Sequence, residues 1–269
     1  LSVGEPDHDT PEVIKEAARQ ALADGFTKYT EEAGMPELRQ AICEKFRAEN
    51  GIACEPDQIV VSNGAKHSLS NLFLAILDPG DEVIIPAPYW VSYPAMVEIA
   101  GGVPVICPWT DGFEPDMEAM RRLVTPRTKA VLVNTPCNPT GAVFSRRVME
   151  EIADLVVRHS LLCIADEIYE KLLYDGATHI SMASLGDEMA GRTVTVNGVA
   201  KTYAMTGWRI GYLAAPKEIA AACARIQGQT TSAPSSISQR AALAALQAGP
   251  RVYEAMLADF RQRRDFILG

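Results

Sequence analysis

Five residues of this 269-residue sequence could together bind an anion and move protons. Lys201 offers an amine, Asp166 a carboxylate and Tyr169 a phenol. Asn138 adds an amide, and Arg209 adds a permanently charged guanidinium that can bind an anion in a bidentate manner. Asp166 and Tyr169 stand in one short run that contains polar residues, and Asn138, Lys201 and Arg209 stand in others.

Taken alone, each of these residues also has an ordinary structural explanation. Lys201 would most often be a solvated surface lysine, and Asp166 could cap a helix. The run from Asn138 to Gly141, Asn-Pro-Thr-Gly, is typical of a β-turn, and Gly64 could be a plain turn glycine. The chemical interpretation therefore depends on whether the fold brings these residues together.

Short β-branched runs alternate with amphipathic stretches of helical length along the chain. The runs are continuously apolar, which is typical of strands covered on both faces. This alternation predicts an α/β fold, a three-layer sandwich in which helices cover both faces of a mostly parallel, seven-stranded sheet. Strands are expected at residues 59–61, 83–85, 103–106, 130–133, 161–165, 194–196 and 210–215. Helices are expected at residues 68–77, 91–100, 116–123, 146–158, 218–227, 236–247 and 252–268.

The polar runs share one position relative to the predicted strands. The runs that contain Gly64, Asn138, Asp166 and Lys201 follow the first, fourth, fifth and sixth strands. Because parallel strands end at one edge of a sheet, these runs should meet there, where α/β proteins bind their ligands. The seventh strand follows the sixth too closely for a helical crossover, so it should be antiparallel and bring Arg209 to the same edge.

The composition argues against several classes of protein. The chain has 25 basic and 34 acidic residues and a net charge of −9, which disfavours nucleic-acid and anionic-membrane partners. No apolar run is long enough to cross a bilayer. The six cysteines are scattered without metal-ligand spacing, which favours free thiols in a reducing cytoplasm. No GxGxxG motif follows the first strand, so a dinucleotide-binding domain is poorly supported.

The motifs together resemble the class I aminotransferases of the fold-type-I pyridoxal-phosphate enzymes. The resemblance extends over nearly the whole chain. The motifs that carry it are Tyr29 with Gly34, Leu38 and Arg39, then Pro88-Tyr89-Trp90, the runs 138–141 and 166–169, and the run from Lys201 to Gly211. A lysine at the position of Lys66 also occurs in one bacterial branch of aspartate aminotransferases, some of which act on prephenate.

The resemblance implies that the cofactor is pyridoxal 5′-phosphate and that each motif has a role in binding or using it. Lys201 would bind the cofactor covalently and then move the Cα proton of the substrate. Asp166 would keep the pyridine nitrogen protonated, while Tyr169 and Asn138 would hydrogen-bond the ring phenolate oxygen. Trp90 would stack on the face of the ring. Lys201, Asp166 and Tyr169 are therefore the expected catalytic residues.

The resemblance also implies a site for the cofactor phosphate. Its donors would be backbone amides at a helix N-terminus, those of Gly64, Ala65 and Lys66. Arg209 would add a charged clamp, and Tyr29 would reach the phosphate of the neighbouring subunit, which implies a homodimer with shared active sites. Many relatives carry a hydroxyl residue at the positions of Ala65 and Gly198. Without those hydroxyls, phosphate binding here depends on backbone amides, Arg209 and Tyr29.

Four residues are expected to contact the substrate. The backbone of Gly4 would lie beside the substrate carboxylate, and Trp90 and Asn138 would contribute from the cofactor side. Lys66 would meet the distal carboxylate of a dicarboxylic substrate. The alternative is that Lys66 faces only solvent or phosphate.

We therefore expect residues 1–20 to lead into a large cofactor-binding domain at 21–269, with the C-terminal small domain of the family absent from the chain. The expected reaction moves the amino group of aspartate, or of a similar dicarboxylic amino acid, to 2-oxoglutarate by a ping-pong mechanism through ketimine and pyridoxamine forms. Alternatives on the same scaffold are an aromatic or alanine aminotransferase, a carbon–sulfur β-lyase, or a ligand-sensing domain of a regulator.

Overall fold

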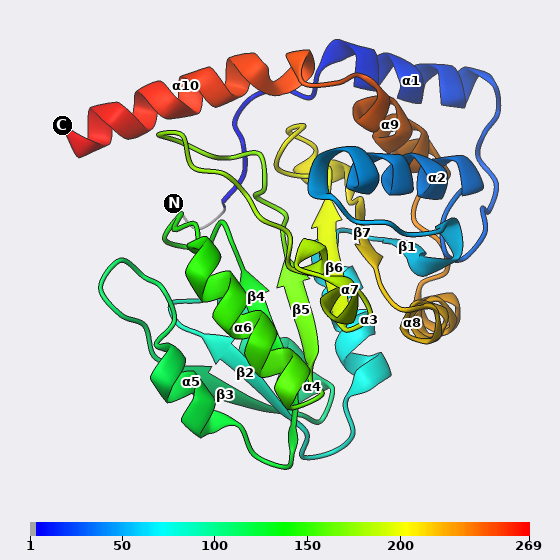
Figure 1. Ribbon diagram of the computed structural model, residues 1–269. Helices are drawn as coiled ribbons and strands as arrows, with labels where there is room; N and C mark the ends of the chain where they lie inside the picture. Colours follow the sequence, from blue (N-terminus) through cyan, green and yellow to red (C-terminus); the bar gives the residue numbers. More distant parts are fainter. Residues whose placement is uncertain (1–3) are drawn as a thin grey trace.

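The computed structural model describes residues 4–269 and contains a seven-stranded sheet with helices on both faces (Figure 1). The strand order is β1-β7-β6-β5-β4-β2-β3. β7 runs antiparallel to both β1 and β6, and all other adjacent strands are parallel. The predicted α/β sandwich with one antiparallel strand is therefore confirmed. The strands are β1 Ile59–Ser62, β2 Glu82–Pro86, β3 Val103–Cys107, β4 Thr128–Asn134, β5 Leu162–Asp166, β6 Thr193–Gly198 and β7 Gly211–Ala214.

The central strands are continuously apolar because both of their faces are covered. In β4, Ala130 and Leu132 belong to one apolar cluster, whereas Val131 and Val133 belong to a second cluster on the opposite face. The outer strand β3 has only one neighbouring strand, and Ile106 is 40% exposed. The sequence pattern thus reflects the position of each strand in the sheet.

Three groups of helices cover this sheet (Figure 1). α3, α4 and α8 supply apolar residues to one cluster, α5, α6 and α7 to the second, and α1, α2, α9 and α10 to a third beside β1 and β7. No helix within residues 4–269 is both long enough and apolar enough to span a membrane. The helices are α1 Glu12–Ala23, α2 Pro36–Lys45, α3 Ala65–Ile76, α4 Ser92–Ile99, α5 Met117–Leu123, α6 Arg146–Arg158, α7 Asp187–Ala190, α8 Lys217–Thr230, α9 Ser236–Gln247 and α10 Arg251–Leu268.

Two helix starts show where the sequence pattern was sufficient and where it was not. α6 begins as predicted, because the side chain of Ser145 accepts a hydrogen bond from the Val148 amide at 3.4 Å. α3 begins at Ala65, three residues before the predicted start. Gly64 has a φ of 87°, a left-handed conformation that allows the chain to turn directly from β1 into the helix. Lys66 consequently lies in the first turn of α3.

A buried ion pair connects α2 to the segment that follows β5. The Lys45 ammonium contacts the Glu170 carboxylate, and the side chains of both residues are almost completely buried. Asn50 accepts from Lys45 at 2.7 Å and donates to Glu170 at 2.6 Å. Burial alone would raise the pKa of Glu170, but the positive charges of Lys45 and Lys171 outweigh it and lower that pKa. The buried charge of Glu170 is therefore stabilised by the positive charge of Lys45.

We expect Lys45→Met to lower the free energy of unfolding by about 3–5 kcal/mol, because it leaves the Glu170 carboxylate buried without its counter-ion. Urea denaturation measures this change. Lys217→Met is the matched control, since Lys217 pairs with Asp57 at 2.7 Å on the surface and should contribute less than about 1 kcal/mol. Equal losses in the two variants would contradict this interpretation of the buried pair.

Candidate active site

A hollow of about 360 Å³ lies beyond the carboxyl ends of β4, β5 and β6. Lys201, Tyr169, Asn138 and Gly4 line it, all of which were predicted site residues. Its other lining residues come from the N-terminal segment, the loop after β4, the segment after Tyr169 and α10; they are Glu5, Pro6, Pro136, Cys137, Pro139, Gly141, Leu172, Tyr174 and Phe260. Segments far apart in the sequence therefore meet at the edge where the parallel strands end.

Lys201 follows β6 and directs its amine toward the backbone of the N-terminal segment. Its Nζ donates a hydrogen bond to the Gly4 carbonyl and lies 5.7 Å from the centre of the Tyr169 ring. Burial lowers the pKa of Lys201; the Glu5 carboxylate opposes this change, and the Arg209 guanidinium adds to it. A lysine with a lowered pKa is unprotonated more often at neutral pH and is a better nucleophile.

Asp166 ends β5 and is 3% exposed. Its carboxylate accepts hydrogen bonds from the Tyr93 hydroxyl at 2.7 Å and from the Ile168 amide at 3.3 Å. Burial raises the pKa of Asp166 to about 6 despite these donors. Among residues 4–269, no lysine, arginine or histidine forms an ion pair with this carboxylate. Asp166 is therefore suited to a positively charged N–H group of a bound molecule.

The raised pKa predicts a pH-dependent difference between the ligand-free protein and its Asp166→Asn variant. The unfolded carboxyl ionises near pH 3.8, but the folded one keeps its proton to about pH 6. The native state binds more protons in this window, so this group's contribution to stability falls as the pH rises through it. Relative to Asp166→Asn, the wild type should lose on the order of 3 kcal/mol between about pH 4 and pH 7. Urea denaturation across this range tests the effect, and a constant difference would contradict it.

Tyr169 and Asn138 form a hydrogen-bonded pair beside Lys201. The Asn138 side-chain amide donates to the Tyr169 hydroxyl oxygen at 3.3 Å. Burial, reinforced by the Asp166 carboxylate, raises the pKa of Tyr169 to about 12, so the phenol keeps its proton at neutral pH. Asn134 holds this loop in place, because it accepts from the Asn138 amide at 2.8 Å and donates to the Asp166 carbonyl at 3.0 Å. Both side chains can therefore donate hydrogen bonds to a bound oxygen.

Aromatic rings connect Lys66 to Asp166. The Lys66 Nζ lies 4.7 Å from the centre of the Trp90 ring, and Trp90 packs edge-on against Tyr93 at 5.3 Å. Tyr93 is buried and donates to Asp166, but the sequence analysis did not identify it. The sequence feature that could have pointed to Tyr93 is its position three residues after Trp90. This spacing places both side chains near the first turn of α4.

Arg209 lies across the N-terminus of α3. Its Nη2 donates to the Asn63 carbonyl at 3.2 Å, and its Nη1 donates to the Thr206 carbonyl at 2.8 Å. A Cβ atom at Gly64 would lie 2.5 Å from Arg209 Nη2 and would have to displace the guanidinium, and the φ of 87° would also strain any other residue there. Arg209 itself has a φ of 58°, a left-handed conformation that is uncommon for residues with side chains. A guanidinium at a helix N-terminus is suited to an anion such as a phosphate group.

Two further features complete the site. Gly211 packs so closely on Ala65 that a Cβ atom would lie 2.1 Å from the Ala65 nitrogen, a requirement that the sequence analysis missed. In the part of the chain that the structure describes, no carboxylate forms an ion pair with Arg209. Its charge is therefore available to a ligand.

Among the predicted site residues, six do not line the Lys201 cavity itself but belong to the neighbouring contacts described above: Asp166, Arg209, Trp90, Lys66, Gly64 and Ala65. Tyr29 lies apart from all of these contacts. It is 93% exposed and lines a different hollow, of about 580 Å³, between residues 27–30 and 233–237. The prediction placed the Tyr29 hydroxyl at the phosphate of a neighbouring subunit, and a position outside its own cavity is consistent with that role.

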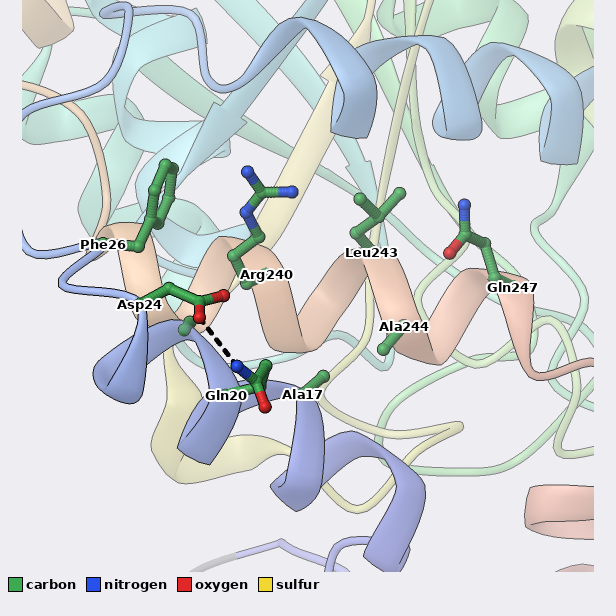
Figure 2. A pocket seen from close by; sticks show the side chains of 9 residues that line it. Ala17, Gln20, Asp24, Phe26, Arg240, Leu243, Ala244 and Gln247 are labelled. Carbon is green, nitrogen blue, oxygen red and sulfur yellow. Dashed lines mark hydrogen bonds between the residues drawn. The ribbon is translucent and has the colours of Figure 1, made fainter.

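Another hollow, of about 360 Å³, lies between α1 and α9 and contains none of the predicted site residues (Figure 2). Gln20 donates to Asp24 at 2.7 Å on α1, and the Arg240 guanidinium lies 4.4 Å from the centre of the Phe26 ring. Alanines and Leu243 line much of the remaining surface. This hollow lacks a lysine amine such as the one that Lys201 supplies to the first cavity.

Comparisons with known proteins identify the family of this chain. The family model described as aminotransferase class I and II matches residues 1–269. The chain is 53% identical to the aspartate/prephenate aminotransferase of Thermus thermophilus, over all of this chain and 70% of that protein. It is 46% identical to the aspartate aminotransferase of Geobacillus stearothermophilus, over 99% of this chain and 68% of that protein.

Solved structures show the same relationship. The aspartate aminotransferase of Rhizobium meliloti superposes with a TM-score of 0.97 at 47% identity, over 99% of this chain and 68% of that one. The aromatic aminotransferase of Pyrococcus horikoshii superposes with a TM-score of 0.96 at 44% identity, over 99% of this chain and 72% of that one. On the strength of the family match and these relatives, the chain belongs to the class I and II aminotransferases.

Proposed function

We propose that this protein is a pyridoxal-phosphate-dependent aminotransferase that takes the amino group from aspartate, or a similar dicarboxylic amino acid, and transfers it to 2-oxoglutarate. The proposal rests chiefly on Asp166, a buried carboxyl with a raised pKa that shares one sheet edge with the Lys201 amine and the Arg209 guanidinium. The aspartate aminotransferases among its relatives support the same reaction.

The residues present fit pyridoxal phosphate in three places. Close packing brings Arg209 and Gly211 against the first turn of α3, because a Cβ atom would lie 2.5 Å from Arg209 Nη2 at Gly64 and 2.1 Å from the Ala65 nitrogen at Gly211. A phosphate group at this helix N-terminus would meet the guanidinium and the first amides of α3. Asp166 offers a carboxylate to a protonated ring nitrogen, and Lys201 offers an amine to an aldehyde. These groups are an anion site, an acid and a nucleophile, which are the three that this cofactor requires.

When bound, pyridoxal phosphate supplies an aldehyde that joins the amino group and a ring that accepts electrons. Lys201 would hold the cofactor covalently, and its amine, when free, would move the proton at the substrate Cα. Asp166 keeps a proton on the ring nitrogen. Tyr169 and Asn138 hydrogen-bond the ring oxygen, and Trp90 packs against the ring face.

Phosphate binding requires groups from two subunits in this proposal. The amides of Gly64, Ala65 and Lys66 and the guanidinium of Arg209 bind the phosphate within one subunit. Tyr29 donates a hydrogen bond from its hydroxyl to the phosphate in the neighbouring subunit, so the active protein is a homodimer.

Residues 21–269 form the cofactor-binding domain, and residues 1–20 lead into it, bringing Gly4 beside the substrate carboxylate.

Lys66 favours a dicarboxylic substrate, because its ammonium lies over the face of Trp90, where it can meet a distal carboxylate. We expect Lys66→Met to lower kcat/KM for aspartate about tenfold or more and to leave kcat/KM for alanine nearly unchanged. Steady-state assays with both amino acids measure this, with the exposed Lys129→Met as the control. If Lys66→Met instead weakens cofactor binding, Lys66 contacts the cofactor phosphate. If the kinetics are unchanged, Lys66 faces only solvent.

The second candidate function is an aromatic aminotransferase. Phe260 and Tyr174 line the cavity, and an aromatic aminotransferase is among the solved structures that superpose closely. An absorbance scan of the cofactor-loaded protein separates the two candidates. We expect aspartate and glutamate to convert the bound cofactor, whereas conversion by phenylalanine alone would overturn the substrate proposed here.

The six cysteines are buried and form no disulfide. Free buried thiols suit a reducing compartment, and we place the protein in the cytoplasm on this ground.

A further inference from the structure

Gln239 connects the chain segment that carries Tyr29 to the segment that precedes α9. Its side chain is completely buried. Its oxygen accepts from the Met35 amide at 2.8 Å, and its nitrogen donates to the Thr30 hydroxyl at 2.9 Å and the Pro234 carbonyl at 2.8 Å. The side-chain amide thus uses its acceptor and both of its donors, and each bond goes to a different residue.

The two segments joined by Gln239 form the walls of the hollow that contains Tyr29. Residues 27–30 line one side and residues 233–237 the other. Tyr29 is the large hydrophobic side chain with the highest exposure among the described residues, at 93%, although Thr30 beside it is fixed to the core through Gln239. Tyr29 is therefore a highly exposed side chain directly beside a residue whose own side chain is held by a buried group.

A second buried glutamine fixes the same segment farther along the chain. Gln227 of α8 donates to the Glu32 carbonyl at 2.7 Å and to the Val61 carbonyl at 2.8 Å. Gly34 lies so close to Val61 that a Cβ atom would be 2.6 Å from its side chain. The segment is therefore held at Thr30, Glu32 and Met35, and Gln239 supplies the two outer attachments. These are the attachments nearest to Tyr29 and to α2.

We propose that Gln239 is the positioning residue for Tyr29, holding the Thr30 side chain and the Met35 amide so that the Tyr29 hydroxyl points out of its own subunit toward the phosphate in the neighbouring one. The inference rests on the homodimer proposed above. Gln239 touches neither cofactor nor substrate, and it acts only through Tyr29. Replacing it should therefore reduce phosphate affinity only when the Tyr29 hydroxyl is present.

The alternative is that Gln239 only satisfies buried polar groups and stabilises the fold. The two explanations differ in their dependence on Tyr29. A general loss of stability would weaken cofactor binding by the same factor whether position 29 is tyrosine or phenylalanine. A positioning role would lose its effect in the Tyr29→Phe background.

The test is a double-mutant cycle read out as the apparent dissociation constant of pyridoxal phosphate, titrated by absorbance. Tyr29→Phe and Gln239→Leu are made singly and together. Thr30→Val is made in parallel, because it removes only the hydroxyl that accepts from Gln239 and keeps a branched side chain of similar size. The cycle with Thr30→Val decides the question if Gln239→Leu does not fold. Gln247→Leu is the matched control, since Gln247 lies exposed on the same helix (Figure 2).

We expect Tyr29→Phe to weaken cofactor binding about tenfold or more, and Gln239→Leu or Thr30→Val to weaken it by about three- to tenfold. Each double variant should bind like Tyr29→Phe alone, and Gln247→Leu like the wild type. If the factors multiply in full, or if Gln239→Leu and Thr30→Val bind normally while Tyr29→Phe does not, the positioning role is wrong and the dimer contact stands. If Tyr29→Phe binds normally, the dimer contact itself is wrong.

Discussion

Lys201→Ala is expected to abolish covalent attachment of pyridoxal phosphate and to lower transamination by more than about 10⁴-fold. Both effects follow from the loss of a single amine, because Lys201 holds the cofactor and also moves the substrate proton. The amine already has a lowered pKa through burial, and it lies beside Tyr169 in the cavity. The absorbance spectrum of the loaded protein and the rate with aspartate measure the two effects.

Lys66→Ala is the informative control for this prediction, because Lys66 is the other lysine placed near the cofactor. That variant should retain the visible absorbance of the covalently bound cofactor. If Lys201→Ala also retained it, or if borohydride reduction labelled Lys66 in the wild type, the assignment of Lys201 would be wrong.

Asp166→Ala is expected to lower kcat by about 10²- to 10³-fold, because it removes the carboxylate that we propose keeps the ring nitrogen protonated and so stabilises developing negative charge. Cofactor should still attach to Lys201 in this variant, although more weakly. Rapid-mixing absorbance after addition of aspartate measures the rate of the first half-reaction. Unchanged transamination by Asp166→Ala would show that the buried carboxyl does not support the ring.

Tyr93→Phe separates the carboxylate from its hydrogen-bond donor. The Tyr93 hydroxyl lowers the pKa of Asp166, so its removal should raise that pKa further. The rate should fall less than in Asp166→Ala, because the carboxylate remains in place. A loss as large as that of Asp166→Ala would mean that the carboxylate functions only with the Tyr93 hydrogen bond in place.

The sheet and its functional edge could be predicted because the relevant signals are local. Continuous apolar runs identified strands with two covered faces, and the polar residues at their ends identified the edge where Asp166 and Lys201 meet. The short connection between the sixth and seventh strands indicated the reversal that brings Arg209 to that edge. The start of α3 was predicted late, because the pattern of apolar residues does not reveal the left-handed turn at Gly64.

The residues that escaped prediction act through contacts between distant segments. Phe260 of α10 and Glu5 line the cavity with Lys201, but no sequence period relates them to it. Lys45 and Glu170 lie 125 positions apart, and each alone is typical of a solvent-exposed side chain. Contacts of this kind require the tertiary structure.

The central claim is that Lys201, Asp166 and Arg209 surround one flat, phosphorylated ring. A crystal structure of the protein soaked with pyridoxal phosphate tests this claim most directly. We expect electron density joining Lys201 Nζ to the cofactor, the ring nitrogen within hydrogen-bonding distance of the Asp166 carboxylate, and the phosphate against Arg209 and the first amides of α3. A cofactor bound elsewhere, or with its ring nitrogen facing away from Asp166, would contradict the account.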